Sequence, residues 1–331
     1  MTTFSARSTR EHFEHAVLVA DSDDALDRLL VPVLRHHIRS GEPALLVVSR
    51  RTERIVRDRL GSAAGKLGWG DPSAFYQRLG FVYEGFRRHL EQEHAQGRSV
   101  HVIAEPDFTA DLDLPVDRAT AYLAYEAICN DVCAGFGCPV TCIWDSRHHS
   151  AEVIECVRSV HAHELTAEGR QRNSTFVRAQ EHLEFQTHAT MPPAPRRFDI
   201  EITLYATAEL GPSRAAVRAW AGCHGFSVTA AFQVTTAVNE VLTNGLEHGR
   251  PPVRLRAWRH GTTLAVQVDD HGGRRIPPDA GYRPPRLDGA GIGLWMTRQL
   301  ADVVLTRTTG DVTTVRLYFP HAVTHRGLDG G

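Results

Sequence analysis

The sequence predicts two domains, an α/β domain with a mostly parallel sheet followed by an α+β domain with helices on one face of a mixed sheet. Three observations support this. Strand-like and helix-like segments alternate up to about residue 165, the proline-rich stretch MPPAPRR occupies 191–197, and a different order of segments follows. Since prolines stop a helix, we place a first domain at 1–190, a linker at 191–197, a second domain at 198–322 and a tail at 323–331.

In the first domain, four short apolar segments have the character of buried strands, at 15–20, 43–49, 99–105 and 140–145. Amphipathic stretches such as 25–41 and 84–97 lie between them and predict helices on the faces of the sheet. The apolar segment 151–165 has a helical pattern, and we expect the polar stretch from there to about Thr190 to be helical too.

In the second domain, a strand pattern is followed by two helix patterns, a hairpin, a third helix and a closing strand. Ser227 is a plausible N-cap for the longer of the first two helices. The expected elements are, in order, 198–206, 211–225, 227–249, the hairpin of 253–261 and 263–270, 291–304 and 312–319.

Composition excludes several classes of function. The net charge is −2 and no basic tract stands out, so we expect no direct nucleic acid or membrane partner. No stretch has the ~20 apolar residues of a membrane helix, and the first residues have no signal-peptide core. We therefore expect a cytoplasmic protein with reduced cysteines.

Two further motifs of the first domain are weak. Lys66 is the only lysine, but the string 61–67 is one residue short of a P-loop, has Leu67 in place of a hydroxyl residue, and follows a helix pattern. Cys129, Cys133, Cys138 and Cys142 match no common zinc spacing, so core thiols are favoured over a metal or redox site.

Three polar clusters follow one another in the second domain. Glu240, Asn244 and His248 lie four residues apart, on one face of a helix beside an apolar stripe of Phe232, Val238, Val241 and Leu242. An Asn oxygen is a hard ligand suited to Mg²⁺, and a Glu can take a proton from an attacking hydroxyl. Alone, this cluster is better explained as a solvated helix face.

The second cluster is Asp270 and Gly272, where a carboxylate could accept a hydrogen bond from an adenine amino group. The third is Gly289, Gly291, Gly293 and Leu294, whose glycines would expose N–H groups to phosphate at a helix start. An ordinary Asp-Gly turn and a glycine-rich loop explain each of them equally well when taken alone.

Together, EVLTNGLEHG, VQVDDHGG and GAGIGLWMTRQLAD resemble the N, G1 and G2 boxes of the GHKL ATPase superfamily over residues 198–320. The resemblance implies bound ATP and Mg²⁺, with Asn244 as the magnesium ligand, Asp270 reading adenine, and Thr313 contacting phosphate from the last strand. Two departures are Gly273-Arg274-Arg275 after the G1 box and Val312 before Thr313.

Glu240 is similar to the glutamate of the RsbW-type anti-sigma-factor serine kinases, which stands where sensor histidine kinases usually have Asn. This resemblance implies that Glu240 is the general base and that the partner is an STAS-type anti-anti-sigma protein, a sigma factor, or both. A homodimer is expected by analogy only.

Two alternatives stay open. His163-Glu164-Leu165-Thr166 resembles the H-box of a histidine kinase, although only about 25 residues separate it from the linker. The other alternative is a degenerate ATPase that sequesters its partner without phosphorylating it.

Residues 11–165 resemble the MEDS sensory domain, with a RecA/KaiC-like fold. The resemblance implies that a small molecule, conceivably a hydrocarbon derivative, is sensed there. The matching positions are His15, Asp21, Glu105, Glu126, Cys142, Asp145 and His161. An equally strong explanation for each is that it caps or ties an α/β core.

Overall fold

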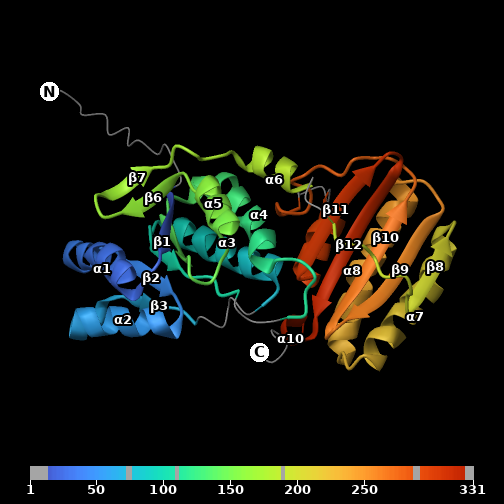
Figure 1. The fold of residues 1–331 in the computed structure, drawn as a ribbon, viewed down its shortest axis with the longest axis horizontal. Helices are drawn as coiled ribbons and strands as arrows, with labels where there is room; N and C mark the ends of the chain where they lie inside the picture. Colours follow the sequence, from blue (N-terminus) through green and yellow to red (C-terminus); the bar gives the residue numbers. More distant parts are fainter. Residues whose placement is uncertain (1–13, 72–76, 109–111, 188–190, 286–290, 325–331) are drawn as a thin grey trace. The chain divides into compact units, whose positions relative to one another are not determined.

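The computed structural model describes residues 14–71, 77–108, 112–187, 191–285 and 291–324 (Figure 1). The chain divides into two compact units. The first unit contains residues 1–70, 87–106 and 129–176, and the second contains residues 71–86, 107–128 and 177–331. Helices α3 (Leu79–Ala95) and α4 (Arg118–Val132) begin in the second unit and end in the first.

The first unit contains a seven-stranded sheet in the order β3-β2-β4-β5-β1-β6-β7. All neighbouring strands are parallel except β6 and β7, which form an antiparallel hairpin at one edge. This confirms the predicted mostly parallel α/β sheet. The strands are β1 (His15–Ala20), β2 (Ala44–Val47), β3 (Gly68–Trp69), β4 (His101–Ala104), β5 (Val140–Asp145), β6 (His163–Thr166) and β7 (Gly169–Arg172).

Local signals set the helix ends of this unit. Helix α1 (Asp23–Ser40) begins after Ser22, whose side chain accepts a hydrogen bond from the Ala25 N–H, and it ends at Gly41, which has φ +75°. Helices α2 (Arg50–Leu60) and α5 (Ala151–Val160) also begin after serine caps. The short 3-10 helices are η1 (Gly61–Lys66) and η3 (Ala134–Phe136). Lys66 therefore follows a helix, unlike the lysine of a P-loop.

Each face of the sheet has its own set of side chains, because successive residues of a strand point to opposite sides. Leu18 and Ile143 are register neighbours on β1 and β5, and they pack with the buried leucines of α1. Val17 and Cys142 are the next pair and point to the opposite face. His15, two residues before Val17, shares that opposite face.

The helix predicted for 151–165 and the helical stretch expected beyond it are corrected. Helix α5 ends at Val160, and β6 and β7 follow before α6 (Ala179–Thr187). His161 has extended backbone angles, and β6 pairs with β1, so the free sheet edge determines this segment in preference to its local pattern. Gly169, with φ +98°, lies in the turn between the two strands.

The second unit contains a five-stranded sheet in the order β11-β12-β10-β9-β8. Every pair is antiparallel, so the expected mixed sheet is wrong. The prediction missed β11, because its first residues were taken as the end of a helix. The strands are β8 (Ile200–Leu204), β9 (Val253–His260), β10 (Thr263–Asp270), β11 (Val303–Thr309) and β12 (Val312–Pro320), and the short helices at either end are η4 (Thr207–Glu209) and α10 (His321–Thr324).

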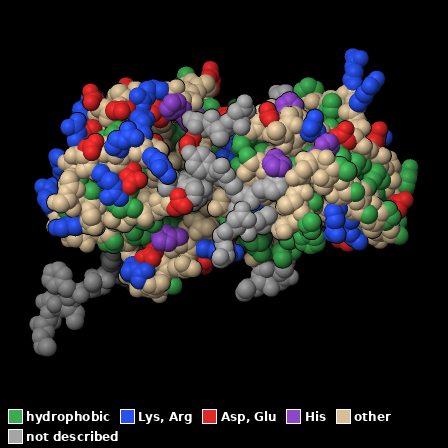
Figure 2. All heavy atoms as spheres, turned by 90° about the horizontal axis from the view of Figure 1, so that it is seen from below, with side chains coloured by type: hydrophobic (Ala, Val, Ile, Leu, Met, Phe, Trp, Pro, Cys, Tyr) green, Lys and Arg blue, Asp and Glu red, His purple; other side chains and the backbone are tan. Residues whose placement is uncertain are grey.

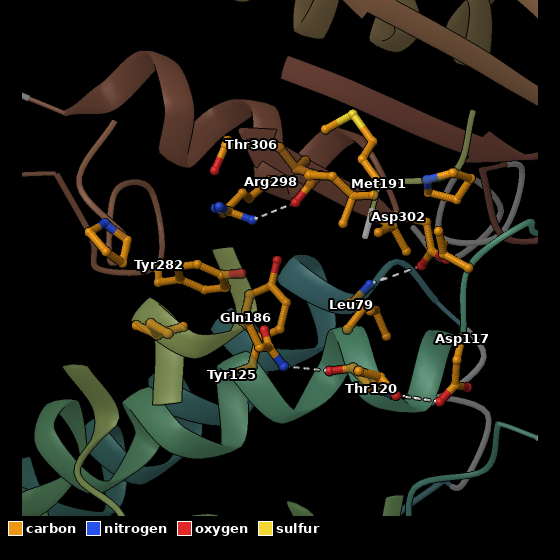
Figure 3. Close-up of a pocket in the computed structure, with 18 of the residues that line it drawn as sticks. Leu79, Asp117, Thr120, Tyr125, Gln186, Met191, Tyr282, Arg298, Asp302 and Thr306 are labelled. Carbon is orange, nitrogen blue, oxygen red and sulfur yellow. Dashed lines mark hydrogen bonds between the residues drawn. The ribbon is translucent and has the colours of Figure 1, made fainter. Parts of the chain in front are cut away.

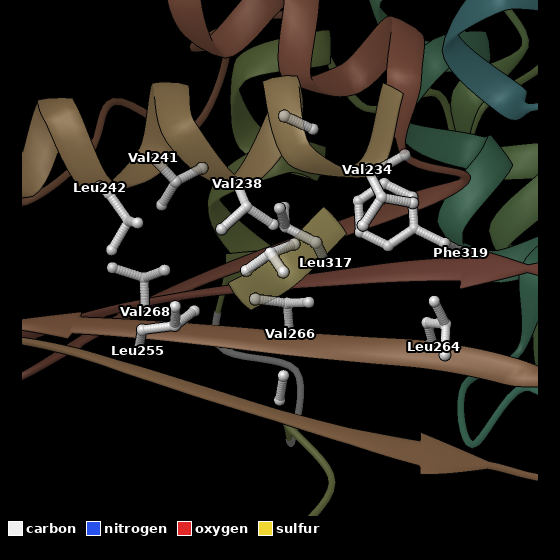
Figure 4. Packing of buried hydrophobic residues seen from close by; sticks show 14 of the residues in the cluster. Val234, Val238, Val241, Leu242, Leu255, Leu264, Val266, Val268, Leu317 and Phe319 are labelled. Atoms are coloured by element: carbon white, nitrogen blue, oxygen red, sulfur yellow. The ribbon is translucent and has the colours of Figure 1, made fainter. Parts of the chain in front are cut away.

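Helices α7 (Leu210–Cys223), α8 (Val228–His248) and α9 (Ile292–Leu300) complete this unit. Figure 4 shows Val234, Val238, Val241 and Leu242 of α8 above the sheet residues that they pack against. Ser227 caps α8 as predicted, by accepting a hydrogen bond from the Ala230 N–H. Phe232 was expected in the apolar stripe but is 55% exposed, with Arg218 over its ring.

Charge is distributed without long runs of one sign. On the face drawn in Figure 2, acidic and basic side chains are interspersed, in keeping with a net charge of −2. No described helix combines the length and the apolar content that a membrane span requires.

Candidate nucleotide site

A cavity of about 680 Å³ lies in the second unit, between the polar face of α8, the end of β10 and the start of α9. Its size is within the range of small-molecule sites. Most of the residues predicted from the three sequence clusters line it. They are Glu240, Asn244, His248, Asp270, Gly291, Gly293, Leu294 and Thr313.

Helix α8 presents one polar face to this cavity. Glu240, Asn244 and His248 are successive turns of that face, whereas Val238 and Val241 are buried in the core. The amphipathic pattern therefore fixes the rotation of α8, and the rotation aims the carboxylate and the amide at the cavity. The alternative of a fully solvated helix face does not describe Glu240 and Asn244, because both are half-buried at the wall of the cavity, whereas His248 is exposed.

The start of α9 closely approaches that polar face. A methyl group added at Gly293 would lie 2.9 Å from the Glu240 Oε2 and 3.5 Å from the Asn244 Nδ2, so a side chain there would displace these groups. Gly291, the N-cap, has φ +83°, which favours glycine. The first N–H groups of α9 are thus held near Glu240 and Asn244, an arrangement suited to phosphate. Gly289 lies outside the described residues.

At the other end, Asp270 closes the cavity between β10 and α8. Its Oδ1 accepts a hydrogen bond from the Gly272 N–H at 2.8 Å. Burial raises the pKa of Asp270, and the N–H groups of Gly272 and Arg250 partly oppose this by stabilising the carboxylate. Gly272 does not line the cavity but orients Asp270, which then has a second oxygen to offer a ligand.

Gly249 was missed by the sequence analysis. A methyl group there would lie 2.4 Å from the Asp270 Oδ1, so glycine lets the end of α8 pass beside the carboxylate. The dipeptide His248-Gly249 at the end of a long helix pattern was the available signal.

One of the two departures from the family pattern lies at the cavity. Thr313 is the register partner of Asp270 on β12, and its hydroxyl donates to the Arg274 carbonyl at 3.1 Å. Arg274 and Arg275, which belong to the departure after the G1 box, line the cavity and bring two arginines to its wall. Val312, by contrast, does not line it.

The residues present fit ATP and magnesium. The cavity offers a buried carboxylate at one end and a helix N-terminus with an amide oxygen at the other, and two arginines also line it. Adenine has an amino donor that suits a carboxylate, and phosphates suit helix N–H groups and arginine. Magnesium accepts the Asn244 oxygen as a ligand alongside phosphate oxygens.

A second cavity of about 330 Å³, lined in part by Arg298 of α9, also lies within the second unit (Figure 3). Arg298 of α9 stacks over the Tyr282 ring at 3.7 Å and hydrogen bonds to Tyr125 of α4. Burial raises the pKa of the Tyr125 hydroxyl. The side chains of Arg118 and Asp302 form a buried bidentate pair at 2.9 Å. Sequence analysis missed these contacts because they join segments about 180 residues apart.

The predicted sensory residues separate into two groups. Asp21, Glu105 and Asp145 follow or end strands at the carboxyl edge of the sheet. Asp21 accepts from the Ser22 hydroxyl and Glu105 accepts from the Ser49 N–H, each at 2.9 Å. Asp145 pairs with Arg51 and Arg147, each at 2.6 Å. The contacts of Glu105 and Asp145 tie loops to the sheet, whereas the contact of Asp21 is with the adjacent residue.

The second sensory group consists of buried side chains. His15, Cys142 and His161, all in the first unit, each offer one potential ligand atom, and these atoms lie within 4.8 Å of one another. Glu126 is also buried and belongs to the part of α4 that lies in the second unit. Six residues of strand separate His15 from Asp21, which corresponds to roughly 20 Å. All six cysteines, each within the described ranges, are thiols rather than disulfides.

Two family models match separate parts of the chain. Residues 14–162 match the family model of MEDS, the MEthanogen/methylotroph, DcmR Sensory domain. Residues 205–319 match the model of the histidine kinase-like ATPase domain. No curated protein matches the chain.

Among solved structures, one similar chain is the histidine kinase domain from Erythrobacter litoralis EL346 blue-light activated histidine kinase. It is 21% identical, and the match covers 66% of this chain and 96% of that chain with a TM-score of 0.26. So low a TM-score carries no structural argument.

Proposed function

Because this chain joins a MEDS domain at residues 14–162 to a histidine kinase-like ATPase domain at residues 205–319, we propose that it is a signal-controlled protein kinase that uses Mg·ATP. The substrate is a serine or threonine of a partner protein. We propose an STAS-type anti-anti-sigma protein as that partner, with a sigma factor as the protein held once the partner is phosphorylated.

The juxtaposition of Glu240, Asn244 and the start of α9 carries this proposal. Phosphates held by the α9 N–H groups would lie beside both side chains. Asn244 would then hold magnesium, and Glu240 would accept the proton of the attacking hydroxyl. A carboxylate at this position supports a hydroxyl substrate, because an alcohol must lose its proton when it is phosphorylated whereas a neutral imidazole nitrogen attacks directly.

The location of His163 favours the serine kinase over the histidine kinase. His163 is the first residue of β6 and pairs with Ala16 of β1, so it lies in a sheet. A phosphoacceptor histidine of the predicted H-box type would need a helical hairpin. The resemblance of His163–Thr166 to an H-box therefore has no structural counterpart.

We further propose that α4 transmits the signal. Its first part contacts the ATPase interior through Arg118 and Tyr125, and Asn130 in its last turn contacts His15 of the first unit. Helix α9 begins at the nucleotide cavity and carries Arg298, the partner of Tyr125. A shift of α4 would thus reach the phosphate end of the cavity through α9.

The test is transfer from γ-labelled ATP to a panel of purified STAS proteins. We expect acid-stable label on a partner serine or threonine with the wild-type chain. Glu240→Gln should lower the transfer rate about 10²–10⁴-fold while ATP affinity is nearly retained. Asn244→Ala should abolish magnesium-dependent transfer. Glu247→Gln, on the same helix and also lining the cavity, is the matched control and should transfer normally.

Other outcomes would overturn the proposal in distinct ways. Acid-labile label on the chain itself would identify a histidine kinase. ATP binding and sigma-factor capture without any transfer would identify a sequestering ATPase. Equal loss of transfer in Glu240→Gln and Glu247→Gln would contradict the role assigned to Glu240.

A further inference from the structure

Three side chains of the first unit converge in its interior. His15 begins β1, Cys142 lies in the middle of β5, and His161 follows the last residue of α5. Each is at most 3% exposed. The His15 Nε2 lies 3.4 Å from the Cys142 Sγ, and the two imidazole ring centres are 4.1 Å apart.

The hydrogen bonds behind the two imidazoles determine which nitrogens face the cluster. The Asn130 Nδ2 donates to the Val160 carbonyl at 2.8 Å, so its oxygen is the acceptor toward the His15 Nδ1 at 3.2 Å. The His161 Nδ1 donates to the Val157 carbonyl at 2.7 Å. Both rings therefore carry their proton on Nδ1, which makes both Nε2 atoms the basic nitrogens.

We propose that His15, Cys142 and His161 bind a divalent transition-metal ion, with Zn²⁺ as the first choice. Two imidazole nitrogens and a thiolate suit zinc and its neighbours, and do not suit magnesium or calcium. The bond lengths of zinc to nitrogen and sulfur place tetrahedral ligands about 3.5 Å apart, close to the distance between His15 and Cys142.

The surroundings match those of ligating histidines in proteins. Such histidines nearly always donate their other N–H to a carbonyl or carboxylate, which fixes the ring and increases its basicity. Asn130 and Val157 provide that contact here. On metal binding the Cys142 thiol releases its proton, so that the thiolate–metal bond replaces the S–H bond, and uptake becomes stronger as pH rises.

The probe is Co²⁺, which replaces zinc and reports a thiolate ligand by a sulfur-to-cobalt charge-transfer band. The full chain, without an affinity tag and treated with chelator and reductant, is titrated with Co²⁺ and then with Zn²⁺. We expect one equivalent of Co²⁺, a charge-transfer band, and loss of the band on displacement by Zn²⁺. An interior held together by hydrogen bonds alone would take up no metal, and that result would overturn the proposal.

Four variants sharpen the test. Cys142→Ser should lose the band, whereas Cys156→Ser, a half-buried cysteine of the same unit, should keep it. His161→Gln should weaken binding at least about 100-fold, and Asn130→Ala about 10–100-fold. A band that survives Cys142→Ser in folded protein, or one that Cys156→Ser removes, would contradict the assignment.

If Cys142→Ser does not fold, the variant His161→Cys tests the metal site instead. A second thiolate on the metal should increase the charge-transfer absorbance at unchanged stoichiometry. An unchanged spectrum in that variant would place the metal elsewhere and would overturn the proposal.

Discussion

The nucleotide cavity and the His15–Cys142–His161 cluster are both formed by several elements, but the chain assembles them differently. The cavity takes Glu240, Asn244, Asp270 and Gly293 from one stretch of consecutive elements. The cluster takes its members from the first strand, the fifth strand and the end of the fifth helix. A site of the first kind leaves spacing patterns in the sequence. A site of the second kind becomes visible only when the sheet order is known.

The largest expected effect tests whether the second unit depends on residues that precede the linker. Arg118 and Asp302 are 7% and 1% exposed, so Arg118→Ala leaves a buried carboxylate without its ion pair. We expect a loss of about 3–5 kcal/mol in the free energy of unfolding, measured by urea denaturation. The exposed pair of Arg283 and Asp279 is the control, and Arg283→Ala should cost at most about 1 kcal/mol.

Equal, small losses in the two variants would contradict this prediction. The second unit would then not depend on α4 for its stability, and the two domains of the sequence would be independent of each other. A large loss in Arg118→Ala alone would show that the ATPase fold includes part of the chain before residue 191.

A smaller effect concerns two partly buried histidines of the first unit. Burial, with His37 and Arg170 nearby, lowers the pKa of His101 from 6.5 to about 3. His101 hydrogen bonds to His37 and to Thr141, each at 2.8 Å. The pKa of His37 is also lowered, mainly by burial. Asp270 in the cavity responds to burial in the opposite direction, with a raised pKa.

The sign follows from proton binding. Between pH 3 and 6.5 the unfolded chain binds more protons at His101 than the folded chain, so the free energy of unfolding falls as pH decreases through that range. From pH 7 to pH 5, His101 alone should account for at most about 2 kcal/mol. His101→Gln should remove that part of the pH dependence in denaturant unfolding, whereas exposed His148→Gln should not. Identical pH dependence in His101→Gln and wild type would contradict the assignment.

The difference between a site built from consecutive elements and one built from distant elements also explains how much of each site the sequence could predict. The polar face of α8 and the turn after β10 depend on local patterns, and the resemblance to the GHKL boxes implied that Asn244, Asp270 and Gly293 share one site. Strand β6 could not be predicted, because its pairing with β1 outweighs the local helical pattern of 151–165. Arg118, Tyr125 and Arg298 also carried no signal, since packing between distant segments joins them.

The sensory residues show an intermediate case. The resemblance to the MEDS domain implied one set of sensory positions, namely His15, Asp21, Glu105, Glu126, Cys142, Asp145 and His161. The parallel sheet separates that set, because His15 and Asp21 lie at opposite ends of one strand. The spacing of the cysteines also pointed away from metal, since Cys142 combines with distant histidines rather than with Cys129, Cys133 or Cys138.

The central claim is that the cavity of the second unit binds ATP with its adenine at Asp270, and calorimetric titration with Mg·ATP tests it most directly. The account predicts that Asp270→Asn weakens ATP affinity about 10–100-fold, the value of one hydrogen bond to a charged acceptor. Asp199→Asn, a carboxylate bonded to Trp220 outside the cavity, should bind ATP as the wild type does. Equal affinity for ATP in wild type and Asp270→Asn would contradict the account.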